Sequence, residues 1–248
     1  MSLARFIYYV LWLMPVPLLA LTAVLMKMRR LHRQFPAFFA YCVFSAVRTP
    51  ILFLVFHRTT AYFYCYWAAE AVSAILGLAS IYEVFLYVFQ GYDRKGRLAQ
   101  SLFRWVGAAL VVAALAAAIA VPGNHENRLI AASLVVDRSV QLVQCGLLLF
   151  VFAASWYLGL SWRSPAFGVA VGFGLFVGVR MALGAMRAQA GLISQDTLSL
   201  LKMASYNCAV LVWLSYLLAP QPAEASAVVP PVAEVESWNR ALLRLLQR

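Results

Sequence analysis

The residues of this sequence that could do chemistry are ionisable side chains inside long apolar segments. Such a side chain costs roughly 2.5–3.5 kcal/mol on membrane-insertion scales, so it must find a partner or water, and it commonly serves a function. Seven side chains meet this description: Arg48, Glu70, Glu83, Asp137, Arg138, Arg180 and Lys202. With a helical rise of about 1.5 Å per residue, all of them except Glu83 are predicted to lie within about 10–15 Å of one membrane face. We call these six side chains the charged layer.

One interpretation of the charged layer is a binding site. It holds four cations and two carboxylates. A pocket there that water can enter would therefore attract a small anion, such as a carboxylate or a phosphate, from the outer side. Gln141 lies four positions after Asp137, so it shares a helix face with that carboxylate. Tyr206 stands in the same relation to Lys202, and both polar residues join the candidate ligand-binding residues.

The alternative interpretation is structural. Arg48 or Arg180 then forms an ion pair with one of the two carboxylates, and the other cations extend to the outer membrane interface. No ligand binds in that case. The sequence leaves both interpretations open.

Motifs of enzymatic chemistry and of metal binding are absent from the sequence. It contains no H-E-x-x-H, G-x-S-x-G, P-loop or dinucleotide-binding glycine pattern. The three histidines fall in predicted loops without carboxylates or cysteines at ligand spacing, and the four cysteines fall in four separate apolar segments. We therefore expect no enzymatic activity, no cofactor and no metal site.

The elements that must position the charged layer are membrane-spanning helices. The 248 residues are 64% hydrophobic and 12% charged, with a mean hydropathy of +0.81. Soluble domains are about half apolar and about a quarter charged, so a soluble globule is excluded. A span needs about 20 apolar residues. Seven segments qualify, which predicts an all-α polytopic transmembrane bundle of seven helices: Phe6–Met26, Pro36–Phe56, Tyr62–Phe89, Val106–Val121, Leu129–Leu160, Ala166–Met186 and Leu198–Ala219.

The net charge of +11 indicates topology and not nucleic-acid binding. Twelve Lys and Arg residues fall in the first, third and fifth loops and the tail, whereas four fall in the N-terminus and the other loops. Because positive residues concentrate on the cytoplasmic side, the N-terminus is predicted outside and the C-terminus in the cytoplasm. We expect a multi-pass protein of the bacterial inner (plasma) membrane, with the lipid bilayer as its partner and no nucleic acid.

The chain is predicted to have one folded domain and a short tail. Residues 1–219 form the transmembrane domain, and residues 220–236 form a linker rich in proline and alanine. Residues 237–248 are predicted to form a basic amphipathic helix. Such a helix would lie on the anionic cytoplasmic leaflet or dock to a partner protein.

The predicted layout resembles a group of bacterial sensors. The seven spans, with the N-terminus outside, and the aromatic and acidic segment Tyr62–Glu83 are similar to the seven-helix sensor regions that precede some histidine kinases and cyclases, and to uncharacterised bacterial membrane proteins. The resemblance implies that the membrane part receives a signal for a cytoplasmic output domain. The 29 residues after Ala219 are too few for such a domain, so a cytoplasmic or membrane signalling partner is expected.

The first hypothesis is therefore a sensory or ligand-binding membrane protein. Its charged pocket would face outward, and it would signal through a partner. A transporter or permease is an alternative, although the sequence shows no inverted repeat. The other alternative is a structural subunit of a membrane complex, in which the charged layer braces the bundle.

Overall fold

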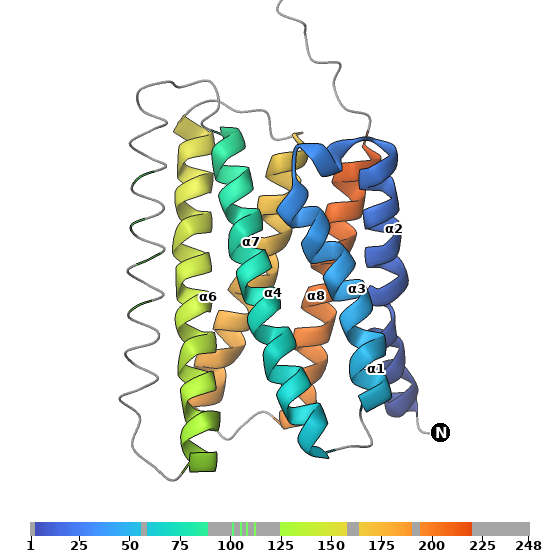
Figure 1. Ribbon diagram of the computed structural model, residues 1–248, viewed down its shortest axis with the longest axis vertical. Coiled ribbons are helices and arrows are strands. Elements are labelled where there is room, and N and C mark those ends of the chain that lie inside the picture. Colours follow the sequence, from blue (N-terminus) through green and yellow to red (C-terminus); the bar gives the residue numbers. More distant parts are fainter. Residues whose placement is uncertain are drawn as a thin grey trace, which may run out of the picture. The chain divides into compact units, whose positions relative to one another are not determined.

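The computed structural model describes residues 3–55, 59–88, 101, 105, 108, 112, 125–157, 164–189 and 194–219 (Figure 1). All the elements in this part of the chain are helices, which confirms the all-α prediction. They are α1 (Leu3–Leu13), α2 (Pro15–Met28), the short 3-10 helix η1 (Leu31–Arg33), α3 (Pro36–Val55), α4 (Thr59–Val88), α6 (His125–Tyr157), α7 (Pro165–Gln189) and α8 (Gln195–Leu218).

Five helical segments in the described residues are long and apolar enough to cross a membrane. They are Phe6–Met28, Pro36–Val55, Ala61–Val88, Pro165–Met186 and Asp196–Leu218. Only 22–39% of the most apolar stretch of each segment is buried inside the protein, and many of its large apolar side chains are exposed. An apolar surface of that extent requires lipid around it. The chain is a multi-pass membrane protein.

Two parts of the predicted layout lie largely or wholly outside the described residues. The predicted span Val106–Val121 is represented by Ala108 and Val112 alone, and both are helical. The predicted linker 220–236 and the predicted amphipathic helix 237–248 lie wholly outside them. The predicted span Leu129–Leu160 overlaps α6, which is 33 residues long and is not among the five segments above.

The helices form a closed ring. α2 contacts α3, α3 contacts α4, α4 contacts α6, α6 contacts α7, α7 contacts α8, and α8 returns to α2. α4 also contacts α7 across the ring, and α1 contacts α8 and α2. We call the end where α2 stops and α3 begins the upper end (Figure 1). α3 and α7 run downward from it, whereas α2, α4, α6 and α8 run toward it.

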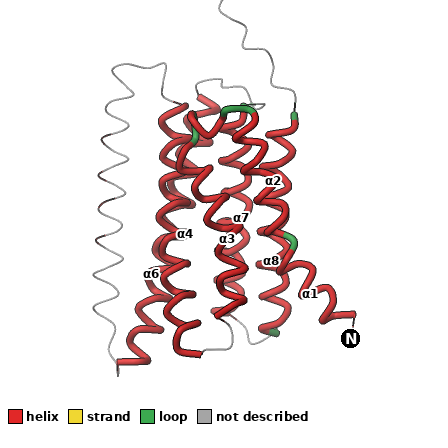
Figure 2. Tube along the Cα trace, turned by 45° about the vertical axis from the view of Figure 1, so that its right-hand side comes forward, coloured by secondary structure: helices red, strands yellow, loops and turns green. Residues whose placement is uncertain are grey.

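The first predicted span is divided into two helices. The sequence predicts a continuous helix over Phe6–Met26, but the structure breaks it at Met14, and Figure 2 shows α1 bending away from the line of α2. Pro15 causes the break, because proline has no backbone N–H and its ring crowds the carbonyl four residues earlier. That carbonyl belongs to Leu11, and the Asn207 side chain of α8 donates a hydrogen bond to it from Nδ2 at 2.9 Å. A side chain thus replaces the missing backbone donor.

Aromatic side chains fill the interior of the helical bundle in its upper half. Phe38, Phe173 and Trp213 come from α3, α7 and α8, and their ring centroids lie 5.0–6.0 Å apart. Each is at most 2% exposed. Trp213 also donates from Nε1 to the Val169 carbonyl at 3.2 Å. Gly172 allows the Trp213 indole to lie this close to the backbone of α7, because a Cβ at position 172 would overlap the indole ring. We call this cluster the aromatic core.

Glu83 lies at the upper end and holds the start of α3. Its carboxylate oxygens accept hydrogen bonds from the backbone N–H groups of Ala37 at 2.5 Å and Phe38 at 3.0 Å. These are N–H groups of the first helical turn, which have no partner within the helix, and a negative charge there also favours the helix dipole. Glu83, the acid that the sequence places apart from the charged layer, therefore caps a helix.

Candidate functional site

A cavity of about 410 Å³ lies below the aromatic core. It is lined by side chains from every described α-helix, and Tyr41, Gly77 and Phe173 lie at its upper boundary. Seven of the eight candidate ligand-binding residues line it: Arg48, Glu70, Asp137, Gln141, Arg180, Lys202 and Tyr206. Five of the six side chains of the charged layer therefore surround a space large enough for a small organic molecule.

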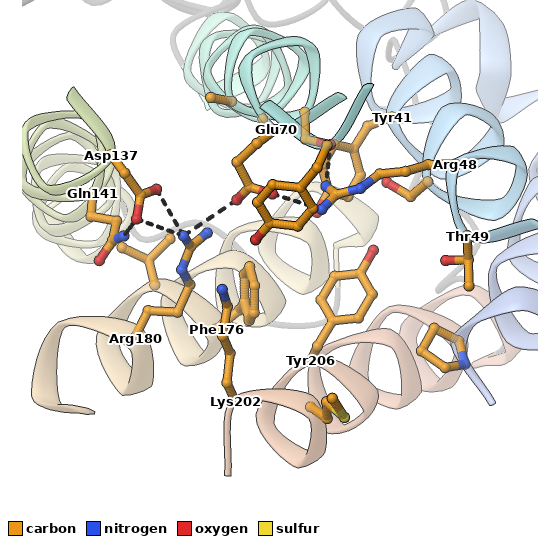
Figure 3. A pocket seen from close by; sticks show the side chains of 18 of the residues that line it. Tyr41, Arg48, Thr49, Glu70, Asp137, Gln141, Phe176, Arg180, Lys202 and Tyr206 are labelled. Atoms are coloured by element: carbon orange, nitrogen blue, oxygen red, sulfur yellow. Dashed lines mark hydrogen bonds and ion pairs between the residues drawn. The ribbon is translucent and has the colours of Figure 1, made fainter. Parts of the chain in front are cut away.

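Two arginines and two acids in the cavity wall form a continuous chain of ion pairs (Figure 3). Arg48 Nη2 lies 2.7 Å from Glu70 Oε2, and Arg180 Nη2 lies 3.4 Å from Glu70 Oε1. The same Nη2 atom of Arg180 lies 2.8 Å from Asp137 Oδ1. We call Arg48, Glu70, Arg180 and Asp137 the ion-pair chain. It joins α3, α4, α7 and α6, so charges from four helices balance one another inside the bundle.

Neutral polar groups extend the ion-pair chain at both ends. Gln141 Nε2 donates to Asp137 Oδ2 at 2.7 Å, as their spacing of four residues predicts. At the other end, Arg48 Nη1 donates to Ser73 Oγ at 2.9 Å. These hydrogen bonds hold the side chains of Asp137 and Arg48 in place. They also supply polar partners that apolar surroundings lack.

Both arginines also lie over aromatic rings. The guanidinium carbon of Arg48 is 5.8 Å from the centre of the Tyr66 ring, and that of Arg180 is 5.3 Å from the centre of the Phe176 ring. At these distances the ring faces attract the cations. The arginine side chains remain 22% and 13% exposed, so a molecule in the cavity can still contact them.

Lys202 is the cavity cation outside the ion-pair chain. Its side chain is exposed within the wall of the cavity, and Figure 3 shows its ammonium directed toward the side where Arg180 lies. Its ammonium makes no hydrogen bond and no ion pair with any described residue. The cavity wall thus holds three cations and two carboxylates, which leaves one positive charge without a partner.

Arg138 lies away from the cavity. The sequence groups it with the candidate ligand-binding residues, but its side chain is exposed and is not part of the cavity wall. Neighbouring residues on a helix point about 100° apart, because one turn takes about 3.6 residues. With Asp137 directed into the bundle, Arg138 faces its outer side. Depth along a helix, which the sequence gives, does not fix the direction of a side chain.

Most of the uncharged residues in the cavity wall were not predicted from the sequence. Tyr41, Ser45 and Leu52 line the cavity on the same face of α3 as Arg48. Their positions follow the spacing of three and four that marks one helix face. The same spacing connects Phe173, Phe176, Val177 and Arg180 on α7. Selecting the residues three, four and seven positions before and after each charged residue would have identified them.

Metal ligands are not grouped in the part of the chain that the structure describes. No set of three or more His, Cys, Asp or Glu side chains is placed to hold a metal ion there. Each carboxylate of the cavity contacts an arginine instead. The site's chemistry is therefore ion pairing and hydrogen bonding to cations.

Comparisons of the chain with protein-family models, with curated proteins and with solved structures find no match.

Proposed function

We propose that this protein is a sensory membrane protein that binds a small anion in the cavity and signals through a partner. The observation that carries the proposal is that five helices each place one charged side chain in the wall of one cavity: Arg48, Glu70, Asp137, Arg180 and Lys202. Three of these are cations, so the cavity favours a negative ligand. A protein that only needed to join its helices would require neither the space nor the third cation.

The ion-pair chain offers a way to convert binding into helix movement. Arg180 contacts both Glu70 and Asp137 through the same Nη2 atom. A ligand anion near Arg180 competes with these two carboxylates, and each of them belongs to a different helix. If the ligand prefers one arrangement of the pairs, binding shifts the population of helix arrangements. This behaviour agrees with the resemblance to seven-helix bacterial sensors.

The proposed topology has seven crossings, with the N-terminus outside, the C-terminus in the cytoplasm and the cavity on the outer side. α4 ends at the upper end and α6 begins at the lower end (Figure 1), which supports a further predicted crossing, Val106–Val121, between them. Lys27, in the last turn of α2, and Arg29, Arg30 and Arg33, between α2 and α3, lie at the upper end. Positive residues concentrate in the cytoplasm, which supports an outward-facing lower end.

The experiment is a binding measurement on the purified protein in detergent. Thermal unfolding would be followed in a series of sodium salts: chloride, acetate, benzoate, phosphate and sulfate. We expect at least one anion to raise the unfolding temperature of the wild type, because a ligand that binds only the folded state stabilises it. Arg180→Ala and Lys202→Ala should lose this shift.

Arg138→Ala is the matched control for this experiment. It removes a cation one residue from Asp137 on the outer side of α6, so it should keep the anion-dependent shift. Equal unfolding temperatures in all five salts would overturn the proposal. A shift that Arg138→Ala abolishes and Lys202→Ala retains would also overturn it.

A structural subunit is the second candidate, because the ion-pair chain joins four helices. It predicts that exchanging the charges, as in Arg180→Asp with Asp137→Arg, restores the folded yield that either single change removes, with no anion effect in any variant. A transporter fits less well, because the aromatic core fills the bundle directly above the cavity. Uptake of labelled anions into proteoliposomes would identify transport.

A further inference from the structure

The anion-binding surface of the cavity can be located more narrowly than the whole charged layer. All ion pairs of Arg180 with Glu70 and Asp137 use its Nη2 atom. Its Nη1 and Nε donors make no hydrogen bond with any described residue. In Figure 3 the Lys202 ammonium lies on the side of the cavity where Arg180 extends its guanidinium. Two cations with unused donors therefore face the same part of the cavity.

The charge of the cavity limits the charge of the ligand. The arginines and carboxylates of the ion-pair chain balance, and Lys202 contributes the single unpaired positive charge. A ligand with one negative charge neutralises it. A second negative charge would lie near Glu70 and Asp137 without a cation of its own, inside surroundings where unpaired charge is costly.

The uncharged part of the cavity limits the shape of the ligand. Trp12, Leu52, Phe173, Phe176 and Met203 contribute apolar surface to its wall. The cavity volume of about 410 Å³ lies in the range of small organic ligands. An inorganic oxyanion would contact the cations and leave the apolar surface uncovered, whereas a ligand with an apolar body would cover both.

We propose that the ligand is an organic monocarboxylate with an aromatic or aliphatic body. This inference rests on the anion-binding function proposed above. The carboxylate lies between Lys202 Nζ and the free Nη1 and Nε donors of Arg180. The body lies against the aromatic wall near Phe176 and Tyr206, which come from the same two helices as the cations.

The test is isothermal titration of the purified full-length protein with a matched set of compounds. Phenylacetate carries one charge and an aromatic body, and acetate carries the charge alone. Phenylacetamide has the body without the charge, phenylmalonate has the body with two charges, and inorganic phosphate has no body. We expect phenylacetate to bind at least about tenfold more tightly than each of the others, because burial of the ring and charge-assisted hydrogen bonds both contribute.

Variants then locate the carboxylate. Lys202→Gln should weaken phenylacetate binding at least about tenfold, because charge-assisted hydrogen bonds are about twice as strong as neutral ones. Lys202→Arg should restore most of the affinity, and Arg138→Gln should leave it unchanged. Unfolding temperatures without ligand show whether each variant is folded. If Lys202→Gln fails to fold, Lys202→Met and the comparison of compounds on the wild type still decide the question.

The outcomes separate this inference from the function on which it rests. Phosphate or acetate binding as tightly as phenylacetate would overturn the ligand class and leave anion binding in place. Equal phenylacetate affinity in the wild type and Lys202→Gln would overturn the position of the carboxylate. No heat from any of the anions would overturn both this inference and the proposed function.

Discussion

The upper and lower halves of the bundle are built from the same helices but are filled in opposite ways. In the upper half, α3, α7 and α8 bring Phe38, Phe173 and Trp213 into mutual contact, with almost no exposed surface. In the lower half the same three helices carry Arg48, Arg180 and Lys202 around a cavity. Aromatic rings can interlock without polar partners, whereas cations need a carboxylate or hydration and so keep space around them. The upper half therefore contributes closely packed apolar contacts, whereas the lower half has the space and the charges on which the proposed binding depends.

The largest expected effect contrasts two tryptophans. Trp213→Ala should lower the free energy of unfolding by about 3–5 kcal/mol, because it leaves a cavity in a closely packed region and removes the bond to Val169. Trp12→Ala, in the wall of the existing cavity, should cost about 1 kcal/mol or less. Unfolding in mixed detergent micelles measures both. Equal losses would contradict the division of labour between the two halves.

The next effect contrasts two acids on α4. Glu70→Gln should lower the free energy of unfolding by about 2–3 kcal/mol, because two guanidinium groups lose their shared carboxylate in surroundings that hydrate them only in part. Glu83→Gln keeps one acceptor for the start of α3 and should cost about 1 kcal/mol. The same unfolding measurement applies. A larger loss from Glu83→Gln would show that the helix cap, and not the ion-pair chain, is the more important polar contact.

The smallest effect contrasts two glycines on α7. Gly172→Ala should cost about 1–2 kcal/mol, because the new methyl group would overlap the Trp213 indole and force α7 and α8 apart. Gly178→Ala should change stability by about 0.5 kcal/mol or less, because no described residue outside its own helical turns lies within 4 Å of the added atom. Thermal unfolding of the two variants side by side is sufficient. A neutral Gly172→Ala would mean that the aromatic core tolerates repacking.

The sequence predicts the helices well because a membrane leaves few choices. Apolar length identifies the spans, since any backbone that crosses the bilayer must satisfy its own hydrogen bonds. Apolar length does not predict the break at Met14. Pro15 and Pro17 mark a weak point, but a helix can also continue through proline with a kink. The partner that stabilises the break is Asn207, which is 196 residues away from Leu11 in the chain.

The charged residues of the site are predictable for a similar reason. A charge within a span must face protein or water, so the six charges of the charged layer are expected to turn inward. Five of them line the cavity, whereas Arg138 does not. The pairing among them is not predictable from depth alone, because several partners lie at similar levels. Each of the two arginines could pair with either of the two acids. The directions of the side chains and the order of neighbouring helices decide which pairs form.

The hydrogen bond from Asn207 to Leu11 joins α8 to α1, which are far apart in the sequence. It therefore bears on the order in which these helices reach their final positions. Translation produces α1 and α2 long before it produces α8. Until α8 is made, the Leu11 carbonyl lacks the donor that Pro15 cannot supply, and α1 lacks one of the two helices that it contacts. We therefore expect the N-terminal helix to reach its final position after α8 enters the membrane. The part of the cavity wall that α1 provides, Tyr8, Leu11 and Trp12, is completed at the end of biogenesis.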